Sequence, residues 1–321
     1  MMEKVVAVVV TFNRKALLIE CLAALLRQSC PLQKIVLIDN ASTDGTHEAL
    51  GELGHLSHPS IDYHRLSSNT GGAGGFHEGM KRGLALAPDW LWLMDDDAEP
   101  ADDALEQLQL GQCQDSTVAV ACMPVGTDGV PQWVHRGWHD PKSSDLVGLT
   151  HLSQKDLIGT PVQIGFASFV GICVSARAAR QIDLPRKEFF IHFDDYEYCI
   201  RLGQLGDLWL MPHSLILHKD ARTAGGAISG SVTRQVLKYD RLWLTYFGPR
   251  NRLWMRLHQA SLDTRIKVLM AESAEVLRHC AGALRHRDDH MFRRCLLRIF
   301  SFVDGVRGNF DNERPRKVLF D

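Results

Sequence analysis

The chain has 321 residues, of which 45% are hydrophobic, so it can bury one large core or two modest ones, as an enzyme-sized globular protein does. No window reaches about 18 uninterrupted apolar residues, which excludes a membrane-spanning helix. The formal net charge of −2 is distributed unevenly. Residues 1–230 hold 18 of the 36 Lys and Arg and 28 of the 38 Asp and Glu, so they carry −10. Residues 231–321 hold the other 18 basic and 10 acidic residues, so they carry +8.

The eight cysteines are scattered along the chain, without a C-x-x-C motif or another paired spacing. This distribution favours neither a zinc site nor a disulfide framework, and it indicates a reducing, cytoplasmic compartment. The first residues, MMEKVVAVVVTFNRK, contain a short apolar run that turns polar too early for a signal peptide or a spanning segment.

The first predicted elements follow a strand–helix–strand order. Val5–Val10 is an apolar, mostly β-branched run without polar alternation, which predicts a strand buried on both faces. Residues 14–29 repeat apolar residues at helical spacing and Pro31 ends the helix, while residues 34–40, KIVLIDN, predict a second buried strand. This order is that of a βαβ unit.

The same alternation continues to residue 97. We expect a helix after the capping residues Ser42 or Thr43, a strand at 61–68, a helix that starts at about Phe76, and a strand at 90–97. This order predicts an α/β fold with a doubly wound, mostly parallel sheet flanked by helices, whose ligands lie beyond the carboxyl ends of the strands. Polar clusters fall at four of those ends: residues 11–14, 39–40, 69–72 and 95–97.

The pattern becomes mixed after a helix at about 101–114. Residues 117–125 predict a strand, residues 126–160 are rich in Gly, Trp, His and Pro, and residues 166–182 read as a strand followed by a helix. From Ser231 onward, apolar residues recur three and four positions apart beside Arg and Lys, which predicts a helical region. We therefore expect two domains, 1–230 and 231–321, with the Gly-rich stretch 221–232 as a linker or mobile loop.

Three consecutive carboxylates, Asp95, Asp96 and Asp97, end the apolar run 90–94. They repel one another unless a cation neutralises them, and Mg²⁺ and Mn²⁺ prefer oxygen ligands of this kind. In an extended segment Asp95 and Asp97 point the same way and can share one ion, whereas Asp96 faces elsewhere. An acidic, solvated loop without a ligand is the alternative that this motif alone leaves open.

The segment NTGGAGGFHEGM, residues 69–80, adds a second signal. Its glycines allow close approach of the backbone to a pyrophosphate, and the helix after it presents unpaired N–H groups to anions. It is neither the dinucleotide fingerprint, which would follow the first strand, nor a P-loop, because it has no Gly-Lys-Ser/Thr. A nucleotide with a metal-bound diphosphate suits this loop and the three aspartates together.

Two further polar sites follow apolar runs. Asp194, Asp195 and Glu197 come directly after the nearly all-apolar segment FFIHF. Apolar surroundings raise the pKa of a carboxyl group and suit it to act as a base. The alternative is that they serve only as partners of the helix dipole. His218 ends the run LILH, where it is either a structural histidine or a ligand that completes a metal site with the aspartates.

At this point the sequence resembles the family-2 inverting glycosyltransferases, which have the GT-A fold. The resemblance covers residues 5–255 and depends on motifs in the family's order: VVTFNR (9–14), VLIDNASTDGT (36–46), NTGGAGGFHEGM (69–80), MDDDAEP (94–100), FFIHFDDYEYCIRL (189–202), LILHKD (215–220) and YFGPRNRLWM (246–255). The last motif departs from the family, because a Gly-Pro pair precedes the Arg-Asn and leaves its local helix geometry undefined.

The resemblance implies a role for individual residues. Asp195 would deprotonate the acceptor hydroxyl, and Asp95, Asp97 and His218 would bind Mn²⁺ or Mg²⁺. The donor would be held by Thr11, Asn13, Arg14 and Asp39 at its base and ribose, and by Asn69 and Gly74 near its sugar and phosphates. Asp96 is a further candidate for donor binding. Position and composition, not the resemblance, suggest that Arg250 and the loop 221–232 close over the diphosphate.

The Gly-rich loop with Phe76 and the triple aspartate most resemble galactofuranosyltransferases. The resemblance therefore implies transfer of galactofuranose from UDP-galactofuranose to a glycan or lipid-linked glycan in bacterial surface polysaccharide synthesis. The alternatives are a rhamnosyltransferase that uses dTDP-rhamnose, a nucleotide-sugar-binding protein without turnover, and a metal-dependent nucleotidyltransferase, which would release pyrophosphate.

The basic C-terminal helices suggest a partner. Their apolar residues Trp254, Met255 and Leu257, beside Arg250, Arg252 and Arg256, could lie on an anionic membrane surface next to a lipid-linked acceptor. The alternative is a solvated basic face whose apolar side packs on the catalytic domain. No nucleic-acid-binding module is recognisable, so we expect no nucleic-acid partner.

Overall fold

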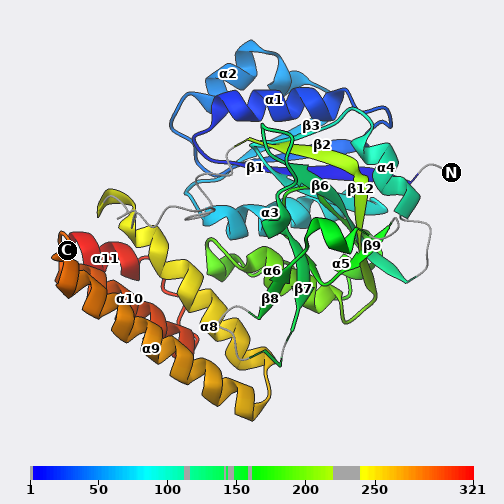
Figure 1. Ribbon diagram of the computed structural model, residues 1–321. Coiled ribbons are helices and arrows are strands. Elements are labelled where there is room, and N and C mark those ends of the chain that lie inside the picture. Colours follow the sequence, from blue (N-terminus) through cyan, green and yellow to red (C-terminus); the bar gives the residue numbers. More distant parts are fainter. Residues whose placement is uncertain (1–2, 112–115, 141, 144–147, 158–160, 220–238) are drawn as a thin grey trace. The chain divides into compact units, whose positions relative to one another are not determined.

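The computed structural model describes residues 3–111, 116–140, 142–143, 148–157, 161–219 and 239–321 (Figure 1). It divides into two units. Unit 1 comprises Met1–Trp138, His151–Lys187 and Asp194–Ala224, and unit 2 comprises His139–Thr150, Glu188–Phe193 and Gly225–Asp321. The linker predicted at 221–232 lies outside the described residues.

Unit 1 begins with the predicted alternation of strands and helices: β1 (Val5–Thr11), α1 (Lys15–Leu26), β2 (Lys34–Asp39), α2 (Thr46–Glu52), β3 (Ile61–Arg65), α3 (Gly71–Ala85) and β4 (Trp90–Asp95). The strands pair in parallel in the order β3-β2-β1-β4. Helices α1 and α2 cover one face of this sheet and α3 covers the other (Figure 1). The predicted doubly wound arrangement is thereby confirmed.

The second half of unit 1 makes the sheet mixed. It adds β5 (Ala98–Pro100), α4 (Ala104–Gly111), β6 (Thr117–Val125), β9 (Val162–Ile164), β11 (Ile172–Ser175), α5 (Ala176–Ala179), α6 (Asp194–Leu202) and β12 (Asp207–His218). Strand β11 lies antiparallel between β4 and β6, while β12 runs parallel to β6 and antiparallel to β5 and β9. Short strands β7 (Arg136–His139), β8 (Leu149–His151) and β10 (Phe166–Ala167) lie outside this sheet, and β10 pairs with β7.

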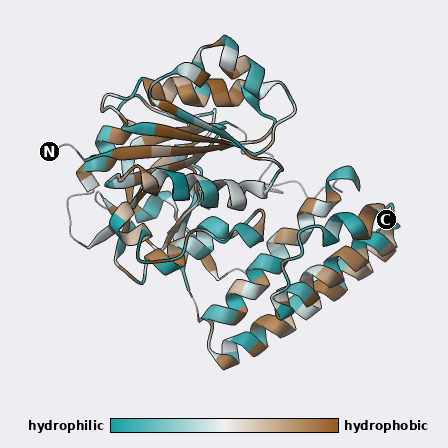
Figure 2. Ribbon diagram, turned by 180° about the vertical axis from the view of Figure 1, so that it is seen from behind, coloured by the Kyte–Doolittle hydropathy of each residue, from teal (hydrophilic) through white to brown (hydrophobic). Residues whose placement is uncertain are grey.

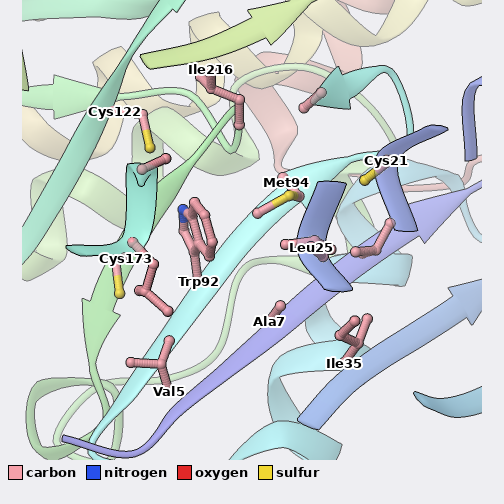
Figure 3. Close-up of a cluster of buried hydrophobic side chains, with 14 of the residues drawn as sticks. Val5, Ala7, Cys21, Leu25, Ile35, Trp92, Met94, Cys122, Cys173 and Ile216 are labelled. Atoms are coloured by element: carbon pink, nitrogen blue, oxygen red, sulfur yellow. The ribbon is translucent and has the colours of Figure 1, made fainter. Parts of the chain in front are cut away.

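One part of the unit 1 core lies between the sheet and α1 (Figure 3). Trp92 and Met94 of β4, with Cys122 of β6 and Cys173 of β11, pack in one buried cluster with Leu25 of α1. Strands β1, β2 and β4 are mostly apolar (Figure 2), because the parallel part of the sheet has helices on both faces and exposes neither side to water. The described cysteines are free thiols.

Helix α3 starts at Gly71, five residues before the predicted start at Phe76. The glycine-rich segment is helical because it must approach the sheet closely. A Cβ at Gly75, Gly79 or Gly83 would lie 2.4, 2.4 and 2.7 Å from side-chain atoms of Val10, Val8 and Leu91. These glycines sit four residues apart on one face of the helix, so they fit α3 against the strands.

We expect Gly79→Ala to destabilise unit 1, because its methyl group overlaps Val8 in a core that has no room to expand. The expected loss is about 1–3 kcal/mol, measured as a lower urea midpoint. Gly72→Ala in the same helix is the matched control, since nothing lies within 4 Å of the position that a Cβ would take there, and it should leave stability equal or slightly higher. Equal midpoints for both variants would contradict the packing explanation.

Unit 2 is helical, as predicted. It contains the 3₁₀ segment η5 (Tyr239–Tyr246) and helices α8 (Phe247–Gln259), α9 (Leu262–His286), α10 (Met291–Arg307) and α11 (Arg314–Phe320), whose apolar residues form a separate core around Tyr246 and Phe247. Glu272 of α9 is buried and binds Arg252 of α8 and Arg298 of α10. No helix in the described part of the chain is both long and apolar enough to cross a bilayer.

Six residues of α8 were considered for a membrane surface. Arg250, Met255 and Arg256 are buried in unit 2, whereas Arg252, Trp254 and Leu257 are half-buried. Met255 is fully buried, and the fully buried Arg256 donates from Nη1 to the carbonyl of Asp140 at 3.1 Å. Trp254 contacts the rings of Phe189 and Phe310. The arginines of α8 bind carbonyl and carboxylate oxygens of the unit itself, so this helix presents little basic surface.

Candidate active site

The polar clusters that end the strands meet at one edge of the unit 1 sheet. In the parallel register, Thr11 at the end of β1 lies opposite Asp39 of β2, and Val10 lies opposite Asp95 of β4. At the other end of the strand order, the antiparallel pairing of β12 with β5 sets His218 opposite Ala98. The parallel strands and the β12–β5 pair thus place their polar ends where doubly wound folds bind ligands.

Two of the three aspartates are buried and held by hydrogen bonds. The Thr11 hydroxyl donates to Asp96 Oδ2 at 2.6 Å. The Arg14 guanidinium donates from Nη1 to Asp97 Oδ2 at 2.6 Å and lies 3.6 Å from Asp96 Oδ1. Asp95 is more exposed than its neighbours. Thr11 and Arg14, expected at the donor's base and ribose, therefore contact the carboxylate cluster.

The pKa values show how unfavourable this cluster is without a cation. Burial, followed by the charges of Asp97 and Asp96, raises the pKa of Asp95 well above its usual range. Burial also raises the pKa of Asp96 to about 7. For Asp97, burial opposes ionisation, but the neighbouring His218 and Arg14 outweigh it and lower the pKa. A divalent cation would relieve the repulsion among these groups.

His218 faces Asp97 with a defined ring nitrogen. Its Nδ1 lies 2.8 Å from Gln132 Oε1, an amide oxygen that only accepts, so in the neutral ring we assign the proton to Nδ1. Nε2 then presents a lone pair toward Asp97 Oδ1, 3.4 Å away. That oxygen is buried and has no hydrogen-bond partner. Two acceptors that face each other in a buried site fit a shared cation.

The described residues contain no group of three His, Cys, Asp or Glu side chains arranged to hold a metal ion by themselves. The predicted set is thus only partly assembled: Asp97 and His218 are adjacent, while Asp95 acts on Asp97 through its charge. This arrangement fits Mg²⁺ or Mn²⁺, which commonly bind through one or two protein ligands and take the rest from water and phosphate oxygens.

Gln132 and His135 complete the surroundings of His218, and neither was predicted from the sequence. The His135 ring meets the His218 ring edge-on at 4.9 Å, and its Nδ1 lies 2.9 Å from the Ser168 hydroxyl. Burial, with the charges of His218 and Arg136, lowers the pKa of His135 to about 3, so this ring is neutral. Both residues lie in the irregular stretch 126–160, where only the density of His, Trp and Gly could have drawn attention.

The other predicted donor-binding residues shape the neighbouring loops. Buried Asp39 accepts from the Tyr63 hydroxyl at 2.7 Å and from the Ser42 N–H at 2.7 Å. The exposed Asn13, at a φ of 55°, accepts from the Thr43 N–H at 2.6 Å. Asn69 accepts from the Gly71 N–H at 2.8 Å, and so sets the entry to α3.

Gly74 lies in the first turns of α3. A Cβ there would come within 2.4 Å of the Thr70 hydroxyl oxygen, so a side chain does not fit. Thr70 is itself tied to β2, because its N–H donates to Asn40 Oδ1 at 2.8 Å. The Gly-rich segment is therefore connected to the strand end that carries Asp39.

The second acidic cluster belongs to the same unit. Asp194 and Asp195 open α6, and the charge of Asp194 contributes to the raised pKa of Asp95. Asp194 is buried, and burial together with Asp195 raises its own pKa well above the usual range. Asp195 is partly exposed. Burial raises its pKa to about 6, although the hydrogen bond from the Tyr196 N–H and the charge of Arg136 act to lower it. A carboxyl group with this pKa is ionised at neutral pH and can accept a proton.

Arg250 lies in unit 2 and is fully buried. Its guanidinium donates to Asn251 Oδ1, Asn312 Oδ1 and the carbonyls of Glu188 and Phe189, at 2.9–3.1 Å. These contacts satisfy Nε, Nη1 and Nη2 within unit 2. Arg250 therefore fixes the segment Glu188–Phe193 by hydrogen bonds to its backbone.

Comparison with known proteins defines the class. The family model described as glycosyl transferase family 2 matches residues 6–175, and the chain belongs to this family. It is thus a glycosyltransferase. The chain is 32% identical over 211 residues to galactofuranosyltransferase GlfT1 of Mycolicibacterium smegmatis, a match that covers 64% of this chain and 67% of that protein.

Solved structures share the fold. GalNAc-T7, crystallised with UDP, GalNAc and Mn²⁺, superposes with a TM-score of 0.60 at 17% identity over 79% of this chain, which spans about half of that protein, 47%. Mannosyltransferase PcManGT of Pyrobaculum calidifontis, in complex with GDP-Man and Mn²⁺, superposes with a TM-score of 0.53 at 14% identity, covering 98% of this chain and 88% of that one. The expected GT-A fold is confirmed.

Proposed function

We propose that the chain is a metal-dependent, inverting glycosyltransferase that uses a nucleotide-sugar donor, with residues 1–230 as its catalytic, donor-binding domain. The facing pair Asp97 Oδ1 and His218 Nε2 carries this proposal, because it is a buried site for a cation beside loops suited to a nucleotide. UDP-galactofuranose is the favoured donor, in view of the 32% identity to galactofuranosyltransferase GlfT1, and dTDP-rhamnose is the alternative.

Asp97 and His218, with Asp95, would hold Mn²⁺ or Mg²⁺, the former being the ion in two structural relatives. The ion would supply positive charge against the negative charge that develops on the departing nucleoside diphosphate. Arg14 and the hydroxyl of Thr11 keep Asp97 and Asp96 in place, so this edge of the sheet needs little rearrangement when donor binds.

In the proposed reaction, an acceptor hydroxyl attacks the anomeric carbon of the donor sugar in one displacement. The new C–O bond forms as the bond to the diphosphate oxygen breaks, and configuration at that carbon inverts. Asp195 accepts the hydroxyl proton, which its pKa of about 6 permits at neutral pH. The nucleoside diphosphate leaves with the electron pair of the broken bond.

Screening the purified protein against UDP-galactofuranose, dTDP-rhamnose and other nucleotide sugars tests the proposal. We expect release of a nucleoside diphosphate that requires Mn²⁺ or Mg²⁺ and stops with chelator. Release of pyrophosphate from a nucleoside triphosphate would instead identify a nucleotidyltransferase. Donor binding without any turnover on glycan or lipid-linked glycan acceptors would support the non-catalytic alternative.

A second prediction concerns the ring nitrogen that His218 presents. Gln132→Lys replaces the acceptor opposite Nδ1 by a donor, which favours the tautomer with its proton on Nε2 and should weaken Mn²⁺ binding about 10–100-fold. Gln132→Glu is the matched variant: it still accepts from Nδ1 and should bind Mn²⁺ at least as well as the parent. Titration of Mn²⁺ by electron paramagnetic resonance measures both. Equal affinities for the two variants would discard this role of Gln132.

The acceptor we propose is a glycan or a lipid-linked glycan of a bacterial surface polysaccharide. A lipid-linked acceptor places the reaction on the cytoplasmic face of a membrane, with the protein bound there peripherally. Three of the six residues of α8 first considered for this contact, Arg250, Met255 and Arg256, are buried and the other three are half-buried, so α8 offers little surface for it.

A further inference from the structure

Helix α9 exposes one continuous apolar stripe. Leu262, Ile266, Met270, Leu277 and Leu284 are all exposed, with 69% of Met270 and 70% of Leu277 accessible to solvent. At about 100° per residue they fall within an arc of about 80° on the helix. The side of α9 that packs into unit 2 is a different one, since its buried residues include Val268 and Glu272.

Helix α10 carries a second stripe of the same kind. Phe292, Leu296, Ile299 and Val306 are exposed, Phe292 to 71%, and they also fall within an arc of about 80°. A surface helix of a soluble protein ordinarily turns such residues inward. Hydrophobic residues recur along both helices in Figure 2.

The two stripes adjoin each other. Helices α9 and α10 are joined by only four residues, 287–290, and form a hairpin. The thiols of Cys280 and Cys295 are in hydrogen-bond contact across it. Cys280 lies one turn from both Leu277 and Leu284, and Cys295 lies one turn from both Phe292 and Ile299, so their contact runs along the border between the stripes. Together they form one apolar surface, the hairpin face.

The charge around the hairpin face is positive. Among residues 262–307, all of which are described, the exposed charged side chains are those of Asp263 and Asp289 against those of Arg265, Lys267, Arg278, Arg285, Arg287 and Arg307. This is six positive against two negative charges. With the half-exposed Arg293, Asp288 and Glu275, the last of which pairs with Arg278 at 2.7 Å, the net charge is +3. Lys267, Arg278 and Arg285 lie about 140–160° from Leu262 on the helix, beside the stripe, from where long basic side chains reach past an apolar surface.

We propose that the hairpin face binds an anionic membrane surface, with its apolar stripes in the headgroup and acyl boundary and its Lys and Arg on acidic phosphates. An apolar face bordered by basic residues is the pattern of interfacial helices, and anionic lipids attract each nearby Lys or Arg. A second copy of this chain would carry the same net positive charge, so charge disfavours self-association through this face. This membrane contact deepens the proposed function, because it would bring the transferase to a lipid-linked acceptor. Its test needs neither donor nor acceptor.

Flotation of the full chain with phosphatidylcholine vesicles, with and without phosphatidylglycerol, at low and high salt tests the proposal. We expect binding only with phosphatidylglycerol, weakened by salt. Leu277→Glu should lower the partition coefficient at least about tenfold, and Arg285→Ala about fivefold. Leu110→Glu is the matched control, because Leu110 is 67% exposed on α4 and should leave binding unchanged.

Thermal unfolding and donor turnover of each variant separate this proposal from the transferase proposal, since both should stay as in the parent. Met270→Glu provides an independent second disruption of the stripe. No binding of the parent to anionic vesicles at low salt would overturn the proposal, as would equal binding by Leu277→Glu. A concentration-dependent dimer in sedimentation velocity that Leu277→Glu dissociates would overturn it as well, and would assign the face to self-association.

Discussion

Replacement of Asp195 by Asn is expected to lower kcat by about 10²–10⁴-fold while donor affinity stays close to that of the parent. Asn is nearly isosteric and can keep the hydrogen bond from the Tyr196 N–H, but it cannot take a proton from the acceptor hydroxyl. The measurement is the initial rate of nucleoside diphosphate release with acceptor present, together with a donor titration followed by calorimetry.

Asp194→Asn is the matched control. Asp194 is adjacent and more buried, and burial together with the charge of Asp195 raises its pKa well above the usual range, which disfavours the ionised form that a base needs. We expect a loss below about tenfold. A larger effect at Asp194 than at Asp195 would reassign the base to the buried carboxyl group.

The pH profile tests the same assignment from another side. Because the pKa of Asp195 is raised to about 6, its ionised form is lost as pH falls through that value. We therefore expect kcat/KM to be constant above pH of about 7 and to fall tenfold per unit well below about 6. A profile that is flat down to pH of about 5 would exclude Asp195 as the base.

The strand ends of unit 1 could be predicted from sequence, because few structures can bury a long apolar run completely. Residues 5–10, 35–38 and 90–94 are apolar runs without alternation, which only a sheet covered on both faces can bury. Once those strands are parallel, their polar ends must lie at one edge. The closeness of Asp97 to His218 follows from a different pairing, β12 against β5, which residue pattern alone does not specify.

Features that depend on tertiary fit were not predicted. The glycines of α3 favour a loop by their low helix propensity, yet the close approach to Val8 and Val10 makes that segment helical from Gly71. Gln132 lies in an irregular segment, so nothing periodic connects it to His218 eighty-six residues later. Arginines are ordinarily at the surface, but Arg256 is buried against backbone carbonyls, and composition does not reveal that.

Replacement of Asp97 by Asn is expected to weaken Mn²⁺ binding about a hundredfold and turnover by at least as much. Asn keeps an oxygen near His218 but removes the negative charge, and hard cations depend on that charge. Arg14 also loses its carboxylate partner at 2.6 Å. The substitution therefore leaves the Arg14 guanidinium and the Mn²⁺ ion near each other without the negative charge between them. Mn²⁺ titration and rates at rising Mn²⁺ concentration measure the two effects, and excess Mn²⁺ should restore part of the rate.

Asp96→Asn is the control for this substitution, since Asp96 is equally buried and its amide oxygen can still accept from the Thr11 hydroxyl. With a pKa of about 7, Asp96 is only partly ionised at neutral pH, and its loss of charge should change Mn²⁺ affinity less than about fivefold. If Asp97→Asn bound Mn²⁺ like the parent, or if chelator left turnover of the parent unchanged, the cation would have no place between Asp97 and His218. The facing acceptors would then need a proton between them, which a protonated His218 paired with the Asp97 carboxylate would provide.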